Sequence, residues 1–227
     1  MAREGRWVGR FERVSKSGLN VRIVLSLITL VGVAGVVAVV AIGGNGGSAR
    51  GAGAGGGQLR AEEVFSAPTA APGLALDNYL GEPVNIEEYR GKAVLVTFLY
   101  TNCPDVCPLI AASLHSALEL LGRESSKVQV IAVSVDPRGD TAKAVGAFLA
   151  EHHMTGRMQY LVGSAKELGR VWKAWGVGSE RDAGQPQFIN HTGLVYGISG
   201  SGKRMAIYAS NFIPAEVAHD VPLLAAR

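Results

Sequence analysis

The most regular part of the chain alternates short apolar runs with stretches that are apolar at helical spacing. Lys92–Tyr100 (KAVLVTFLY) and Val128–Asp136 (VQVIAVSVD) are nearly continuous apolar runs rich in β-branched residues, which is typical of strands covered on both faces. Helices are expected over 109–122, 141–152, 165–175 and 214–225, and further strands over 191–199 and 204–209. Residues 59–83 carry weaker signals, a short strand and a turn. This alternation predicts a layered α/β sandwich.

The N-terminal region has a different pattern. Residues 23–42 (IVLSLITLVGVAGVVAVVAI) are twenty residues without a charge, and at about 1.5 Å each they reach about 30 Å, the thickness of a bilayer's hydrocarbon core. A cleaved secretory signal is the alternative, but its apolar stretch usually runs only about 7–15 residues. Six basic residues precede the run, and the next one after it is Arg50. The positive-inside rule therefore predicts a cytoplasmic basic tail (1–22), a transmembrane anchor (23–42) and export of everything beyond it.

Composition separates the exported part into two pieces. Residues 43–58 (GGNGGSARGAGAGGGQ) are mostly glycine and predict a flexible linker. Residues 59–227 contain 15 basic and 17 acidic side chains, so the overall net charge of +3 comes from the N-terminal tail. A nucleic-acid partner is not expected, because it would require a basic surface on the folded domain. The sequence thus predicts a single-pass protein of the cytoplasmic membrane with an extracytoplasmic domain over 59–227.

Both cysteines of the chain, Cys103 and Cys107, lie in one turn, TNCPDVCPL, directly after a predicted buried strand. Open α/β sheets place their chemistry at the carboxyl ends of such strands. Pro104 suits the first position of a helix, which would put Cys103 at or just before the helix cap and Cys107 about one turn in. The positive end of a helix lowers the pKa of a nearby thiol. This turn suits a dithiol, a disulfide or a metal.

Several other readings of the turn are weaker. A purely structural disulfide would close a loop of about five residues and constrain the unfolded chain very little. A closed structural zinc site needs four ligands, and the chain has only two cysteines. Thioredoxins have two residues between their cysteines, whereas this turn has three. A peroxiredoxin would have Pro and Thr where Val96 and Tyr100 stand.

Three motifs, in order and spacing, resemble those of the Sco/SenC family: FLYTNCPDVCPL (98–109), VSVDPRGDT (133–141) and INHTGLVY (189–196). The resemblance covers about residues 60–225. It implies a membrane-tethered thioredoxin-like domain, with a central mixed sheet flanked by helices. It also implies copper binding and assembly of the binuclear copper site of cytochrome c oxidase subunit II.

Carried over position by position, the resemblance implies three metal ligands. Cys103 and Cys107 match the family's two thiols, and His191 matches its histidine. Asp136 stands where the family has its Asp-Pro motif, near the site. Ala142 replaces a common proline, and residues 199–202 replace an acidic turn, but neither departure affects a ligand.

Two functions use the same sulfurs. The first is a copper metallochaperone without turnover of its own, since two thiolates and one imidazole suit Cu(I) and, with an added oxygen ligand, Cu(II). Its partners would be a copper donor and an acceptor, either the oxidase subunit or another cuproprotein. The second is a thiol-disulfide oxidoreductase in which Cys103 and Cys107 reduce a cysteine pair of such a partner. The role of His191 discriminates between them, because only metal binding requires its imidazole.

Overall fold

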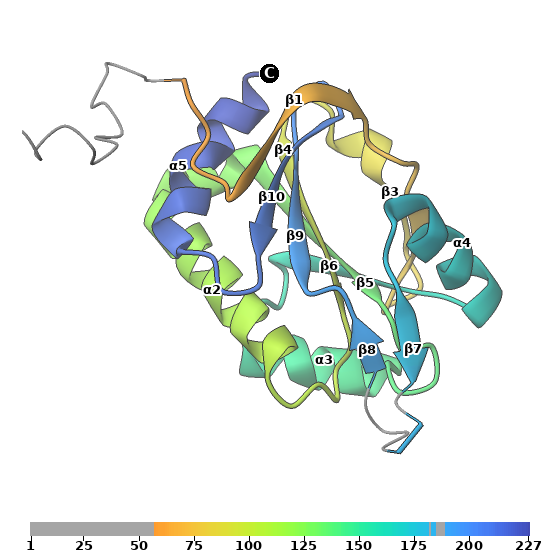
Figure 1. Ribbon diagram of the computed structural model, residues 1–227. Helices are drawn as coiled ribbons and strands as arrows, with labels where there is room; N and C mark the ends of the chain where they lie inside the picture. Colours follow the sequence, from red (N-terminus) through yellow and green to blue (C-terminus); the bar gives the residue numbers. More distant parts are fainter. Residues whose placement is uncertain (1–56, 182, 185–188) are drawn as a thin grey trace, which may run out of the picture. The chain divides into compact units, whose positions relative to one another are not determined.

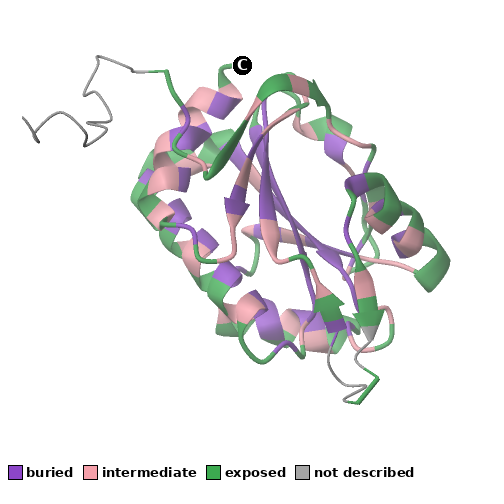
Figure 2. Ribbon diagram, in the orientation of Figure 1, coloured by how far each residue is buried: buried purple, intermediate pink, exposed green. Residues whose placement is uncertain are grey.

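The centre of the fold is the pair of apolar strands that the sequence predicts. In the computed structural model, which describes residues 57–181, 183–184 and 189–227, β4 (Ala93–Leu99) is buried at every position (Figure 2). β5 (Val128–Ser134) is buried at all positions except Gln129. The two strands pair in parallel from Ala93 opposite Val128 to Leu99 opposite Ser134, so their carboxyl ends meet at one edge of the sheet.

The sheet has eight strands in the order β1-β10-β9-β4-β5-β6-β2-β3. The remaining strands are β1 (Glu63–Ala70), β2 (Ala75–Asn78), β3 (Pro83–Asn85), β6 (Met158–Val162), β9 (Leu194–Ile198) and β10 (Lys203–Ala209). Only the β4–β5 and β5–β6 pairs are parallel among these strands, and the others are antiparallel. The expected mixed sheet is therefore confirmed.

Helices cover both faces of this sheet (Figure 1). The helical elements are α2 (Val106–Leu121), α3 (Ala142–Glu151), α4 (Ala165–Trp175), α5 (Pro214–Ala225) and the short 3-10 helices η1 (Ile86–Tyr89) and η2 (Gly122–Lys127). α2 and α5 pack side by side on one face. On the other face, Trp175 of α4 meets Phe98 and Tyr196, with ring centroids 6.0 and 5.4 Å away. The predicted layered α/β sandwich is confirmed.

The predicted strand over 191–199 is divided in the structure. β8 (Ile189–His191) pairs with β7 (Ser179–Arg181) in a separate two-stranded sheet, and β9 begins only at Leu194. Between them, Gly193 passes so close to α2 that a Cβ atom there would lie 2.8 Å from Cγ1 of Val106. The chain changes sheets at a point where only glycine fits against the start of α2.

A buried carboxylate secures the start of the domain. Asp220, inside α5 and fully buried, accepts hydrogen bonds from the backbone N–H groups of Arg60 and Ala61 and from the hydroxyl of Tyr208. Arg60 and Ala61 lie 160 and 159 positions before Asp220 along the chain. These bonds attach the segment before β1 to the last helix.

Replacing Asp220 by Ala is expected to lower the free energy of unfolding of the domain by about 3 kcal/mol, because three donors lose a buried acceptor. Chemical denaturation followed by circular dichroism measures this loss. The matched control is Asp77→Ala, an exposed carboxylate, whose removal is expected to change stability by less than about 0.5 kcal/mol. Equal effects of the two substitutions would contradict the anchoring role of Asp220.

Residues Gly56–Arg227 form one compact unit with its own core. Within the described part of this unit, no helix has the length and apolar character needed to cross a bilayer. The predicted basic tail (1–22), the predicted span (23–42) and most of the predicted linker lie outside the described residues.

Candidate metal centre

The cysteine turn leads from β4 into α2, as the sequence predicts, and the helix starts before the predicted range of 109–122 but after Pro104. Its first residue is Val106, and the side chain of Asp105 accepts the N–H of Val106 at 2.5 Å. Pro104 is therefore not the first helical residue, and Cys107 stands at the second position of the helix rather than one turn in. Asp105 caps the helix in place of Cys103, because a carboxylate that accepts a free N–H is a better cap than a cysteine. Cys107 therefore lies closer to the positive end of α2 than expected.

The two sulfurs interact while both cysteines remain reduced. Sγ of Cys103 accepts the backbone N–H of Cys107 at 3.4 Å, and the structure contains both as free thiols. The thiol of Cys107 donates to Cys103 and lowers the pKa of Cys103 well below its usual value, and His191 and the helix N–H groups add to this effect against the opposing effect of burial. The same bond, together with complete burial, raises the pKa of Cys107. Cys103 is thus the thiolate of the pair and Cys107 the proton donor.

The structure brings His191 to the cysteine turn from 84 positions along the chain. Nε2 of His191 lies 3.6 Å from Sγ of Cys107. Nδ1 of the same ring is buried and has no hydrogen-bond partner among the described residues. His191 stands at the end of β8, immediately before the turn at Gly193 that contacts α2.

The donor set fits a soft metal ion in part. Sγ of Cys107 and Nε2 of His191 are 3.6 Å apart. A metal such as zinc bonds to sulfur at about 2.3 Å and to imidazole nitrogen at about 2.0 Å. The two atoms are therefore close enough together for one ion to be held by both. In the described part of the chain, however, no three His, Cys, Asp or Glu side chains are arranged to hold a metal as they stand. Binding by Cys103, Cys107 and His191 together therefore requires at least one side chain to move.

Asp136 lies on the α3 side of the turn. It is buried, accepts the N–H of Arg138 at 3.2 Å and lines a hollow with Thr101 and Asn102, apart from the hollow that contains Cys103 and His191. This arrangement places Asp136 near the cysteine turn, in a different hollow from Cys103 and His191.

Sequence reasoning missed a second buried carboxylate, Asp140. It accepts the N–H and the hydroxyl of Thr101, both at 2.8 Å, and the hydroxyls of Ser134 and Tyr160 at 2.6 and 3.0 Å. Burial raises the pKa of Asp140, and these hydrogen bonds oppose that rise. This network fixes Thr101, the residue that leads from β4 into the cysteine turn. The only sequence signal for Asp140 was its position after DPRG in VSVDPRGDT.

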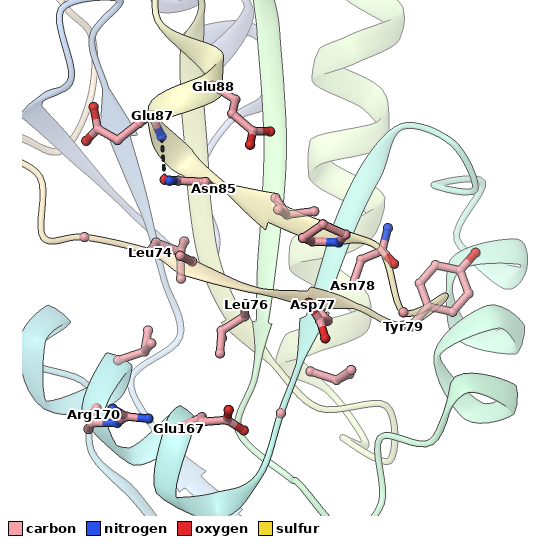
Figure 3. A pocket seen from close by; sticks show the side chains of 18 of the residues that line it. Leu74, Leu76, Asp77, Asn78, Tyr79, Asn85, Glu87, Glu88, Glu167 and Arg170 are labelled. Atoms are coloured by element: carbon pink, nitrogen blue, oxygen red, sulfur yellow. Dashed lines mark hydrogen bonds between the residues drawn. The ribbon is translucent and has the colours of Figure 1, made fainter.

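The hollow at the site has a volume of about 430 Å³. Its lining comes from the cysteine turn, β8 and the loop after β10: Tyr100, Cys103, Pro104, Asp105, Val106, Ile189, Asn190, His191, Gly193 and Ser210. A larger hollow of about 1210 Å³ lies between the β2–β3 hairpin and α4, where Asn85 accepts the N–H of Glu87 (Figure 3). None of its described lining residues is Cys or His, so we place the chemistry in the smaller hollow.

The lowered pKa of Cys103 predicts how its reactivity depends on pH. Below its pKa of about 8.5, a free thiol loses about tenfold in alkylation rate for each pH unit, because only the thiolate reacts. Cys103 is expected to react at a nearly constant rate between pH 6 and 8, since its folded-state pKa lies below this window. Iodoacetamide labelling followed by mass spectrometry measures the rate at each cysteine. A Cys103 profile that follows the free thiol would contradict the thiolate assignment, and Cys107 should remain unlabelled until the protein is denatured.

The fold and the reduced cysteine pair at a helix N-terminus define a thioredoxin-like protein with a thiolate–imidazole site. The family model described as SCO1/SenC matches residues 68–225, and the chain belongs to this family. The family expected from the three sequence motifs is thereby confirmed.

Individual relatives agree with this assignment. The bovine mitochondrial protein SCO2 homolog is 28% identical over 150 residues, which are 64% of this chain and 56% of the relative. The mouse mitochondrial SCO1 homolog is 25% identical, with 65% of this chain and 53% of the relative covered. The chain thus spans little more than half the length of these curated relatives. The solved structure of Bradyrhizobium japonicum ScoI with copper bound is 26% identical at a TM-score of 0.61, and it covers 69% of this chain and 99% of its own.

Proposed function

We propose that this protein binds one copper ion through Cys103, Cys107 and His191 and delivers it to a cuproprotein. The observation that carries the proposal is the 3.6 Å approach of Nε2 of His191 to Sγ of Cys107, which joins an imidazole to a reduced cysteine pair. Its support from the comparisons is that a family relative of similar fold was solved with copper bound. The membership in SCO1/SenC makes the binuclear copper site of cytochrome c oxidase subunit II the expected acceptor.

The donor set suits delivery as well as binding. Two thiolates and one imidazole favour Cu(I), which accepts low coordination numbers. A three-ligand site leaves room for a ligand of the acceptor to enter, so that the ion passes from one protein to the other by stepwise ligand exchange. Cys103 is the sulfur that supplies charge at neutral pH, whereas Cys107 must release its proton when the ion binds.

The expected topology places this exchange outside the cytoplasm. A single span over 23–42 would anchor the protein in the cytoplasmic membrane, and the glycine-rich linker would let the domain reach a membrane-bound acceptor and a copper donor protein. The copper site would then work in a compartment where cysteines are readily oxidised.

A second function is favoured by the unequal pKa values of the two thiols. A thiolate beside a protonated thiol is the arrangement of a thiol-disulfide reductase: Sγ of Cys103 attacks a disulfide of the partner, and Cys107 then resolves the mixed disulfide. The partner disulfide gains two electrons and is released as two thiols, while Cys103 and Cys107 become a disulfide. In this function the protein would reduce the cysteines of the copper acceptor.

Copper titration of the reduced protein tests the main proposal. We expect one Cu(I) per chain, protection of Cys103 from alkylation by the bound ion, and no tight binding after Cys103 is alkylated. A protein that binds copper equally well with Cys103 alkylated would refute the site. A protein that binds no copper but reduces a model disulfide would support the second function instead.

A further inference from the structure

The strand that carries His191 is not part of the main sheet. β8 pairs only with β7 among the described strands, and Ser179 of β7 is linked to the end of β5 by a hydrogen bond of 3.2 Å to the carbonyl of Val135. The main sheet therefore does not by itself determine where the imidazole lies relative to the cysteines. Some other contact must hold β8 at the cysteine turn.

Tyr100 supplies this contact. It is the last residue before the cysteine turn, and its hydroxyl accepts the backbone N–H of Ile189 at 3.3 Å. Its ring meets the imidazole of His191 edge to face, with centroids 5.6 Å apart and planes at 80°. Tyr100 and Ile189 are both buried, so this hydrogen bond is shielded from water.

Tyr100 also lines the hollow that contains Cys103 and His191. One side chain thus contacts both the strand of His191 and the ring of His191.

The other end of β8 is held differently. After His191, Gly193 passes against Val106 of α2, where a Cβ atom would approach to 2.8 Å. This contact fixes the chain on the C-terminal side of the imidazole, whereas Tyr100 fixes it on the N-terminal side. Nδ1 of His191 has no hydrogen-bond partner among the described residues, so the ring gains no orientation from that atom.

We propose that Tyr100 is a positioning residue that holds the imidazole of His191 against the cysteine pair through its hydroxyl and its ring. The inference rests on the proposed function, because the position of His191 matters for copper binding only if His191 is a copper ligand. The hydrogen bond to Ile189 itself is a property of the metal-free protein.

The test compares Tyr100→Phe with Tyr208→Phe in the full chain in detergent solution. Tyr100→Phe keeps the ring and removes only the acceptor of the Ile189 N–H. Tyr208→Phe removes a buried hydroxyl of the same kind, bonded to Asp220 at 2.9 Å on the α5 side, and serves as the matched control. Melting curves verify that both variants remain folded.

Two readouts are measured for each variant. Hydrogen-deuterium exchange of the metal-free protein is expected to be faster at Ile189–His191 in Tyr100→Phe, and unchanged there in Tyr208→Phe. The affinity for Cu(I), measured by competition with a chelator, is expected to fall about five- to tenfold in Tyr100→Phe, as for the loss of one buried hydrogen bond, and to be unchanged in the control.

Unchanged exchange at Ile189–His191 in Tyr100→Phe would overturn the positioning role whatever the copper result. Faster exchange with an unchanged copper affinity would also overturn it, since the contact would then not serve the site. If the unsubstituted protein bound no copper, the proposed function would fail, while the exchange measurement would still decide whether Tyr100 holds β8.

Discussion

Replacing Cys103 by Ser is expected to abolish stoichiometric copper binding. The substitution removes the sulfur that is already a thiolate at neutral pH and leaves Cys107, which is fully buried, as the only thiol. Loss of a hydrogen-bonded partner of a metal ligand already costs about 10–100-fold in affinity, so loss of a ligand should cost more than about 100-fold. Titration with Cu(I) in competition with a chelator measures the change.

The control for this experiment is Ser116→Ala, an exposed position further along α2. It changes the same helix without approaching the cysteine turn, and the copper affinity should not change. A Cys103→Ser protein that still binds one copper ion per chain with the spectrum of the unsubstituted protein would remove Cys103 from the site.

Replacing His191 by Ala is expected to separate the two proposed functions. Tight copper binding should be lost, because the imidazole is the only nitrogen ligand of the proposed set. Thiol-disulfide exchange should be largely retained, since the strongest cause of the low pKa of Cys103 is the hydrogen bond from Cys107, and that bond remains. Copper titration and the rate of reduction of a model disulfide are measured on the same preparation.

His152→Ala is the matched histidine control, because His152 follows α3 and packs on Phe148 with centroids 4.5 Å apart, away from the site's lining residues. It should leave both properties unchanged. If the His191→Ala protein fully supports oxidase assembly, the metal-transfer function gives way to the redox function.

Local patterns predicted the centre of the fold well. β4 and β5 were recognisable because strands that are buried on both faces read as continuous apolar runs. β1 (EVFSAPTA) lies within 59–83, where the sequence indicates only a short strand and a turn, because an edge strand with mostly exposed positions has no apolar pattern. β6 (MQYLV) was missed because its five residues are too short to show a period.

The site was only partly predictable. The cysteine turn is local, so both sulfurs were found from the sequence, whereas His191 came from the resemblance of its motif to a family. The partners of Tyr100 and Asp140 could not be found, because they are tertiary contacts: Tyr100 meets Ile189 from 89 positions away, and Asp140 meets Thr101 from 39. Such contacts depend on how the sheet edges meet and leave no periodic signal.

The central claim is that two sulfurs and one imidazole bind the same copper ion. X-ray absorption spectroscopy of the Cu(I)-loaded protein tests it most directly, because it identifies the atoms around the metal. We expect two sulfur scatterers and one nitrogen scatterer. His191→Ala, loaded with excess Cu(I) to fill its weakened site, is expected to lose the nitrogen scatterer. A spectrum with only nitrogen and oxygen neighbours, or one that His191→Ala leaves unchanged, would contradict the account.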